Sequence, residues 1–364
     1  MITLFEKYPE LKEKLPYVSL ADLPTPVRKL ENLGREIGVE DLYIKQDGVS
    51  GKAYGGNKIR KLEFLLGEAL RDNKKEVMTF GAVGSNHATA TAIFAKQVGL
   101  RSISMLLPQP NAYYIRKNLL MSCHSGAEFH HYSNMNSLNT GTYYQSMRHK
   151  AMKGVPPQII PMGGSAPLGI IGFVNAALEL KEQVAEGKLP EPDLIYVACG
   201  SMGTTIGLTL GVKVAGLKTR VIPVRVASTK SSNKKKFLNL LQQTNALLHS
   251  ADPSFPKFPM VEDELVLRSD FAGKTYALFT KEGMQAIRLM GENEGTELEG
   301  TYTGKALAAL IHDAESGDIK DKVVLFWNTL NSRNFSDAIK DIDYRQLPKP
   351  FHKYFIEEVQ PLDR

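Results

Sequence analysis

Apolar, β-branched runs alternate with helical patterns along most of this chain of 364 residues. Strands that are joined through helices lie parallel, so the alternation predicts an α/β architecture with mostly parallel strands. Residues 109–160 are more polar, and we expect them to be less regular. The predicted strands span residues 42–45, 77–80, 102–107, 194–198, 221–226 and 323–327. The predicted helices span residues 61–71, 87–98, 115–122, 169–185, 205–215, 281–292 and 305–315.

A chain of this length buries a large core and is expected to divide into two domains. Its 43% hydrophobic and 23% charged residues are typical of a soluble globular enzyme. No stretch is apolar enough for a membrane span, and charges interrupt the N-terminus where a secretory signal needs its apolar core. Cys123 and Cys199 indicate neither a disulfide framework nor a zinc site. We therefore expect a cytoplasmic protein without a metal.

The net charge of +6 raises the question of nucleic-acid binding. Its main local contributor is the lysine-rich run 229–236, which opens a predicted helix. Such runs are typical of a solvated surface, so we expect no nucleic-acid partner. Attraction of an anionic substrate by a modest positive field stays open.

Residues 55–58, Gly-Gly-Asn-Lys, carry the strongest chemical signal. Lys58 follows a glycine turn and one amide side chain, and it opens a predicted amphipathic helix. A lysine held at such a place can lose its proton more easily than a surface lysine. Its free amine can then form a Schiff base with a carbonyl, which is how pyridoxal phosphate (PLP) is held. Taken alone, the four residues also suit a turn followed by a solvated helix.

Two strand–glycine–helix junctions add anion-binding backbone. Residues 81–88 read Gly-Ala-Val-Gly-Ser-Asn-His-Ala, and residues 199–207 read Cys-Gly-Ser-Met-Gly-Thr-Thr-Ile-Gly. Glycines let the backbone approach a ligand, and free amides at a helix N-terminus favour anions. The hydroxyl groups of the second junction suit a terminal phosphate. Neither junction has the GxGxxG spacing of a dinucleotide site or a Walker A lysine, so a nucleotide-binding oxidoreductase is the weaker alternative.

Five motifs occur in a fixed order: GGNKxRKLE at 55–63, GSNH at 84–87, PxGGSxPLG at 161–169, GSxGT at 200–204 and YTGKA at 302–306. In this order and spacing the chain resembles the D-cysteine desulfhydrase and 1-aminocyclopropane-1-carboxylate (ACC) deaminase family of fold-type II PLP enzymes. The resemblance implies two open, twisted and mostly parallel sheets flanked by helices, with the cofactor between two domains. Residues 63–172 would form the smaller domain, and residues 1–62 with 173–364 the larger. A homodimer is the family expectation.

The resemblance also assigns roles by position. Lys58 would form the Schiff base and later move the Cα proton of the substrate. Asn57 would bond the cofactor's ring hydroxyl, and Thr329 would contact the pyridine nitrogen. Tyr276 and Tyr302 would lie on the substrate side, where a phenol can protonate a leaving group. The phosphate would be held by Lys61, Gly200, Ser201, Gly203 and Thr204.

The GSNH junction supplies the substrate side of the prediction. Ser85, Asn86 and His87 would hold the substrate carboxylate, and Ser85 joins Lys58 and the tyrosines in the catalytic set. ACC deaminases typically carry Gln at the position of His87 and Glu at that of Thr303. The residues present favour α,β-elimination from a small amino acid such as D-cysteine, which gives a 2-oxo acid, ammonia and sulfide. ACC deamination, or a PLP-binding homologue with another substrate or little activity, remains open.

Three departures from the family pattern bear on the site. Met202 replaces a glycine of the phosphate loop, and an ordinary φ there would accommodate it. Leu330 and Asn331 replace the Gly-Gly that follows Thr329, which changes the rim near the pyridine ring. Residues 336–364 extend beyond the family core, and we expect them to pack against the body or a partner subunit.

Overall fold

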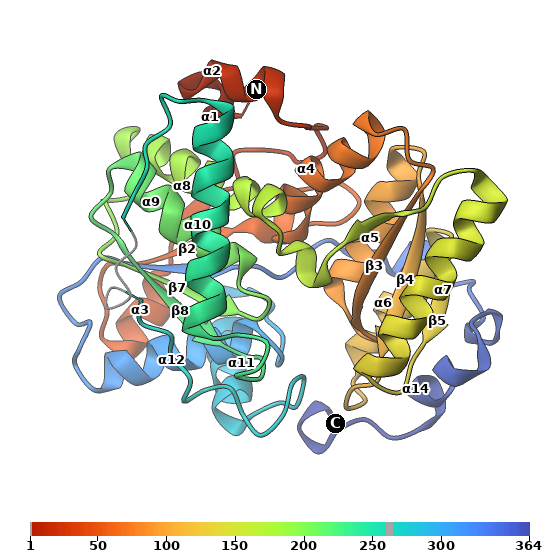
Figure 1. The fold of residues 1–364 in the computed structure, drawn as a ribbon. Helices are drawn as coiled ribbons and strands as arrows, with labels where there is room; N and C mark the ends of the chain where they lie inside the picture. The colour runs from red at the N-terminus through yellow and green to blue at the C-terminus, as the bar shows by residue number, and fades with distance from the viewer. Residues whose placement is uncertain (1, 260–264) are drawn as a thin grey trace.

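The computed structural model describes residues 2–259 and 265–364 and places their strands in two sheets (Figure 1). The larger, five-stranded sheet has the order β1-β2-β9-β7-β8. Neighbouring strands in it are parallel except for the antiparallel pair β1 and β2. Its strands are β1 (Val27–Lys29), β2 (Leu42–Gln46), β7 (Leu194–Cys199), β8 (Arg220–Arg225) and β9 (Val324–Asn328).

The smaller, four-stranded sheet has the order β5-β4-β3-β6 and is parallel throughout. Its strands are β3 (Glu76–Ala82), β4 (Arg101–Leu107), β5 (Glu128–His131) and β6 (Gln158–Ile160). All four lie within residues 63–172, although the proposed domain boundaries themselves remain a prediction. The expected α/β fold with two mostly parallel sheets is confirmed.

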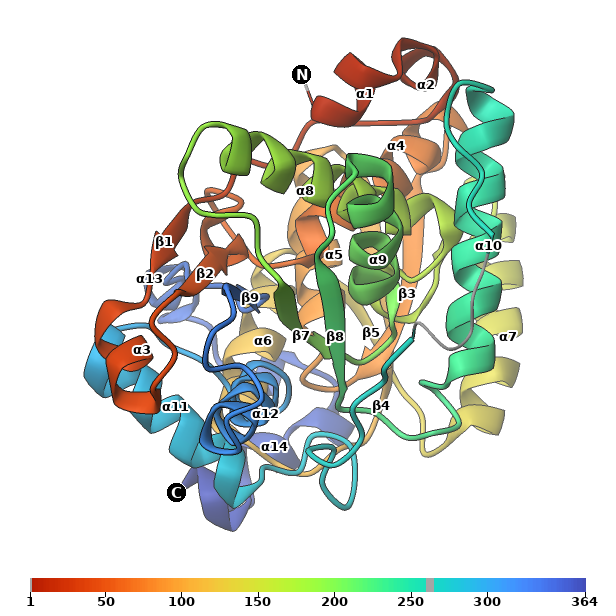
Figure 2. The ribbon, with the colours of Figure 1, turned by 90° about the vertical axis from the view of Figure 1, so that its left-hand side faces the viewer.

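Side chains of β7 show how the larger sheet is buried on both faces. Ile195 and Val197 pack into the core with helices α8 and α9, whereas Tyr196 and Ala198 pack into the core with α11 and α12. Alternate residues of a strand point to opposite faces, so a strand covered on both sides reads as a continuous apolar run. Figure 2 shows α8 and α9 on one side of this sheet and α3, α11 and α12 on the other.

Helices make up most of the rest of the described chain. Those before the smaller sheet are α1 (Thr3–Lys7), α2 (Pro9–Lys14), α3 (Glu31–Ile37) and α4 (Lys58–Arg71). Those within and after it are α5 (Asn86–Gln97), α6 (Tyr113–His124), α7 (Met135–Lys153), α8 (Pro167–Ala185), α9 (Gly203–Ala215), α10 (Lys234–Ala251), α11 (Lys281–Glu294), α12 (Thr303–Glu315), α13 (Ser336–Ile339) and α14 (Lys353–Ile356). Short 3-10 turns include η1 (Asp47–Val49) and η2 (Met162–Gly164).

Residues 109–160 are more regular than expected, because they hold α6, β5, α7 and β6. Only Leu138, Gln145 and His149 of α7 are buried. With so narrow a buried face, this helix lacks the apolar stripe by which sequence periodicity identifies helices. The strand β5, Glu-Phe-His-His, likewise has no apolar run.

The C-terminal segment, residues 336–364, packs against the body of the protein, which is one of the two arrangements expected for it. Leu347, Phe351 and Tyr354 lie in one core with residues of β4 and α6. The Gln360 side chain accepts a hydrogen bond from the backbone N–H of Phe279 at 2.7 Å. This segment, blue in Figure 1, therefore joins α6 to the segment that precedes α11.

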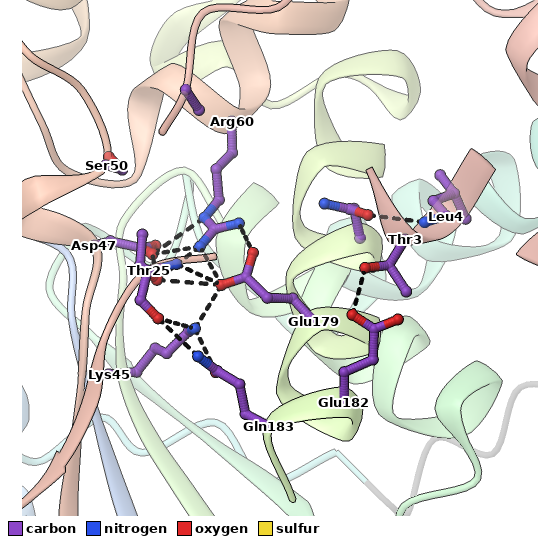
Figure 3. A network of polar contacts seen from close by, with 12 residues as sticks. Thr3, Leu4, Thr25, Lys45, Asp47, Ser50, Arg60, Glu179, Glu182 and Gln183 are labelled. Carbon is purple, nitrogen blue, oxygen red and sulfur yellow. Dashed lines mark hydrogen bonds and ion pairs between the residues drawn. The ribbon is translucent and has the colours of Figure 1, made fainter. Parts of the chain in front are cut away.

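A buried ionic network fixes α4, the helix that Lys58 begins (Figure 3). Arg60 donates hydrogen bonds to Asp47 of η1 at 2.8 Å and to Glu179 of α8 at 2.8 Å. Lys45 of β2 also bonds Glu179, and Trp327 donates its indole N–H to Asp47 at 2.8 Å. Burial alone would raise the pKa of Glu179, but Arg60 and Lys45 outweigh it and hold the pKa at about 2. Because every charge is paired, the network can hold the start of α4 in one position.

No helix among the described residues is both long and apolar enough to cross a membrane.

Candidate functional site

A cavity of about 840 Å³ opens where the carboxyl ends of strands from both sheets meet. Ala82 ends β3, Leu107 ends β4 and Arg225 ends β8, and all three line it. This is the edge at which open α/β sheets bind ligands. Every site residue predicted from the sequence also lines this cavity: Asn57, Lys58, Lys61, Ser85, Asn86, His87, Gly200, Ser201, Gly203, Thr204, Tyr276, Tyr302 and Thr329.

Lys58 is the first residue of α4, and the glycines before it are required by close packing. A Cβ atom at Gly55 would lie 1.8 Å from the carbonyl oxygen of Gly48. Gly56 has φ +88°, and a Cβ atom there would lie 2.8 Å from the carbonyl oxygen of Thr329. The turn therefore presses the start of α4 against the ends of β2 and β9, which aims Lys58 into the cavity.

The amine of Lys58 is poised for chemistry. Burial lowers its pKa to about 8, although nearby Glu299 acts in the opposite direction. A larger fraction of this amine is therefore unprotonated near neutral pH than for an ordinary lysine. That is the form that can attack a carbonyl or accept a proton.

The loop between β7 and α9 forms a cup suited to an anion. The Ser165 hydroxyl accepts a hydrogen bond from the Gly203 N–H at 3.1 Å and donates one to Ser201 at 2.8 Å. The Lys61 side-chain nitrogen donates to the carbonyl of Gly163 at 3.1 Å. Burial, reinforced by Lys58, lowers the pKa of Lys61 well below its usual range. A Cβ atom at Gly203 would lie 2.5 Å from Ser165 Oγ and 2.8 Å from Lys61 Nζ, so any side chain there would fill the cup.

Met202 lies in this cup, and the condition under which it would fit easily, an ordinary φ, is not met. Its φ is +69° and its ψ −19°, the left-handed conformation in which glycine is favoured. The side chain is 4% exposed and packs in the core with α8 and α9. Met202 therefore holds a backbone conformation that glycine adopts freely, at the cost of strain that burial of the methionine can offset.

The β3–α5 junction gives the cavity an unpartnered imidazole. Ser85 caps α5 by accepting a hydrogen bond from the Ala88 N–H at 3.2 Å, and Asn86 accepts one from the Asn118 side chain at 2.8 Å. His87 is 2% exposed, and among the described residues neither of its ring nitrogens has a hydrogen-bond partner of good geometry. Burial, reinforced by Lys58 and Lys61, lowers the pKa of His87 well below its usual range. A buried neutral imidazole with free nitrogens is ready to bond a ligand.

The two predicted tyrosines meet at the opposite wall. The hydroxyl groups of Tyr276 and Tyr302 share a short hydrogen bond, and their rings cross at 72°. Burial raises the pKa of Tyr276 to about 12, and it raises that of Tyr302 well above the ordinary value. Both phenols are therefore neutral near pH 7 and can donate a proton.

Thr329 and Asn57 tie the glycine turn to the cup. The carbonyl of Thr329 accepts a hydrogen bond from the Asn57 N–H at 3.2 Å. The Asn57 side chain donates to the Thr204 hydroxyl at 2.9 Å. The start of α4, the end of β9 and the start of α9 therefore form one connected unit.

The sequence does not single out Ser165 and Glu299, which also line the cavity. Ser165 lies in the PxGGSxPLG motif, to which no role is assigned. The Glu299 carboxylate accepts the N–H groups of Thr301, Tyr302 and Thr303 at 2.7 to 2.8 Å and so caps α12. Burial raises the pKa of this carboxyl group. An acidic residue just before a predicted helix is the signal that could have identified it.

Similarity to known proteins identifies the group to which this geometry belongs. The family description "Pyridoxal-phosphate dependent enzyme" matches residues 18–329. This chain belongs to the pyridoxal-phosphate dependent enzymes. The cofactor is PLP, as the lysine and the anion cup indicate.

Individual relatives agree with this family. A protein of Pyrococcus horikoshii named "Putative 1-aminocyclopropane-1-carboxylate deaminase" is 35% identical over 86% of this chain and 91% of its own length. A crystal structure of an ACC deaminase homologue has 34% identity and a TM-score of 0.76, and it covers 90% of this chain and 94% of its own. Threonine deaminase isoform 2 of Solanum lycopersicum, at 16% identity and a TM-score of 0.59, covers 93% of this chain and 90% of its own. That last likeness concerns the fold alone, which is fold-type II.

The residues present fit the cofactor. The cup around Gly203 has backbone N–H groups, hydroxyls and the Lys61 side-chain nitrogen, the donor set that a phosphate needs, and it has no room for a side chain at Gly203. Lys58 lies in the same cavity with a lowered pKa, as a Schiff-base lysine requires. The unpartnered nitrogens of His87 leave hydrogen-bonding capacity for a substrate.

Proposed function

We propose that this enzyme catalyses α,β-elimination from a small amino acid, with D-cysteine as the best-matching substrate. The overall reaction consumes water and D-cysteine and releases a 2-oxo acid, ammonia and sulfide. It is a lyase reaction that also removes the amino group, as expected of a PLP-dependent deaminase. The hydrogen bond between the hydroxyl groups of Tyr276 and Tyr302 in the cavity is the observation that carries this choice.

Bound PLP supplies the electron sink that makes the substrate's Cα proton acidic. Asn57 would hold its ring hydroxyl, Thr329 its pyridine nitrogen, and the cup its phosphate. A neutral hydroxyl beside the pyridine leaves that nitrogen unprotonated, which suits elimination over transamination. The hydrogen bonds from Asn57 to Thr204 and Thr329 support a single rigid cradle for these contacts.

The substrate would lie between Lys58 and the tyrosine pair. The N-terminus of α5, with Ser85, Asn86 and His87, would hold its carboxylate, because free amides and the helix dipole favour an anion there. Lys58 would accept the Cα proton at Nζ, which its lowered pKa favours. Tyr302, neutral and bonded to Tyr276, would donate a proton to the departing sulfur.

ACC deamination is the second candidate, and the names of the relatives favour it. ACC has no Cα hydrogen, so its ring opening needs a nucleophile such as a deprotonated phenol. The raised pKa values of Tyr276 and Tyr302 disfavour a phenolate. Thr303 stands where ACC deaminases typically carry a glutamate, and its hydroxyl is bonded to Glu299 rather than turned to a substrate. These features favour elimination.

A panel of small D- and L-amino acids, read by 2-oxo acid and ammonia release, tests the proposal. We expect sulfide from D-cysteine and little 2-oxobutanoate from ACC. A Tyr302→Phe variant should keep its cofactor but lose turnover of D-cysteine by about 100-fold or more, the usual share of a general acid. Turnover of ACC alone would establish the second candidate, and bound cofactor without any turnover would indicate a PLP-binding homologue of little activity.

Three further expectations belong to the proposal. Residues 63–172 would move as the smaller domain against residues 1–62 and 173–364, closing over the substrate. The family resemblance supports a homodimer. Cys123 and Cys199 are both free thiols, which supports a reducing, cytoplasmic setting.

A further inference from the structure

A second cavity of about 700 Å³ adjoins the catalytic one. Asn86, Glu299 and Leu330 line both cavities, so these three residues form the partition between them. In the proposed function Asn86 helps to hold the substrate carboxylate, and Glu299 supports Tyr302 through its backbone N–H. The partition therefore borders the place where the substrate's side chain would lie.

Two of the three partition residues are locked in place. Asn86 Oδ1 accepts a hydrogen bond from Asn118 Nδ2 at 2.8 Å. The Glu299 carboxylate accepts three backbone N–H bonds from the start of α12. Neither can turn aside without losing buried hydrogen bonds, and a buried polar group left unpaired is costly.

Leu330 differs because its backbone is fixed while its apolar side chain has no group that could form a hydrogen bond. Its N–H donates to Asn328 Oδ1 at 3.1 Å. A Cβ atom at Gly48 would lie 2.7 Å from the Leu330 carbonyl oxygen, so the backbone of Leu330 is pressed against that turn. The isobutyl group is therefore the part of the partition that a substitution can remove without breaking a hydrogen bond.

The second cavity has a polar lining that suits a polar side chain. Asn118, Thr296, Asn331 and Lys117 contribute to it. Asn331 is anchored by accepting the Gly55 N–H at 2.6 Å, so this wall is continuous with the turn that precedes Lys58. A substrate side chain passing the partition would meet amide, hydroxyl and ammonium groups.

We propose that Leu330 determines substrate size in this enzyme. Its side chain closes the partition and confines the substrate's side chain to the catalytic cavity. Glycine at this position joins the two cavities and admits longer, polar side chains. The inference rests on the proposed function in placing the substrate between Lys58 and the β3–α5 junction, and it applies to any small amino-acid substrate bound there.

Binding of unreactive amino acids to the holoenzyme tests the inference without requiring turnover. Alanine, 2-aminobutyrate, homoserine and glutamine, each as both enantiomers, form a series of rising length that can be titrated by the change in cofactor absorbance. For the wild type we expect affinity to fall by about tenfold or more between alanine and glutamine. For Leu330→Gly we expect glutamine to bind about tenfold or more tighter than to the wild type, with alanine changed by less than about threefold.

Leu330→Ala and Leu240→Ala complete the test. Leu240 of α10 lines only the catalytic cavity, so its truncation removes the same group from another wall and should leave the length dependence unaltered. Leu330→Ala should change the dependence of affinity on side-chain length in the same direction as the glycine variant, without the extra backbone freedom that glycine brings. The inference is overturned if affinity falls with side-chain length in Leu330→Gly as it does in the wild type. It is also overturned if Leu240→Ala changes this length dependence as much as Leu330→Gly does. A wild type that binds alanine but does not turn over D-cysteine overturns the proposed function alone.

Discussion

Substitution of Met202 tests the backbone of the phosphate cup. Replacing it with glycine or with alanine removes the same buried side chain, a loss of roughly 2 to 5 kcal/mol in each case. The two variants differ in the backbone. A non-glycine residue in the left-handed region costs about 1 to 2 kcal/mol, and Met202 has φ +69°. Only glycine relieves this strain.

The difference in the free energy of unfolding between the two variants has a predicted sign. Glycine loses about 0.4 to 1 kcal/mol relative to alanine through its more flexible unfolded chain. The relief of strain exceeds this loss, so Met202→Gly should be more stable than Met202→Ala by about 1 kcal/mol. At an exposed helical position such as Asn139 of α7 the order should reverse, with alanine better by about 1 kcal/mol.

Urea unfolding followed by tryptophan fluorescence provides the assay. Trp327 is the only tryptophan of the chain, it is fully buried, and it belongs to the same core as Met202. Its signal therefore reports on the part of the fold that the substitutions affect, and midpoints compared at a shared slope give the free-energy difference. If alanine is the more stable variant at position 202, as at 139, the left-handed assignment is wrong.

Two further predictions concern α4. Arg60→Met should lower the free energy of unfolding by about 3 to 5 kcal/mol in the same assay, because it removes the ion-pair partner of buried Asp47 and leaves buried Glu179 with Lys45 alone. Arg71→Met on the same helix should cost no more than about 1 kcal/mol, since its ion pair is exposed, and equal effects would contradict a structural role for the network. The rate at which cofactor-free enzyme takes up PLP should rise as the pH passes through about 8, where Lys58 loses its proton. Glu299→Gln should move this rise to lower pH, because Glu299 raises the pKa of Lys58. An uptake rate independent of pH between 7 and 9 would count against the lowered pKa of the lysine.

Strands and helices with a continuous apolar run or stripe were predictable from the sequence. β7 and β9 are buried on both faces and read as apolar runs, and α8 is buried along most of its length. The short strands β1 and β6 and the polar helix α7 have no such signal, because their place in the fold depends on contacts between distant segments. Local patterns therefore identified the central strands of both sheets and the edge strand β8, and they missed the edge strands β1, β5 and β6.

The candidate site shows the same division between local and long-range information. The motif residues were predictable because each lies at a strand end or helix start, and the structure brings them to one cavity. The contribution of Ser165 depends on a hydrogen bond across 36 positions of the chain to Ser201, which no local pattern reveals. The φ of Met202 could not be predicted, because the residue type favours ordinary backbone, whereas this loop adopts the left-handed turn.

Chemical mapping of the cofactor lysine tests the central claim most directly. Holoenzyme reduced with borohydride, digested and analysed by mass spectrometry should carry a pyridoxyl group on the peptide that contains Lys58, and the Lys58→Ala variant should carry none there. A pyridoxyl group on another lysine, or a protein that takes up no PLP and gives no labelled peptide, would contradict the assignment of Lys58.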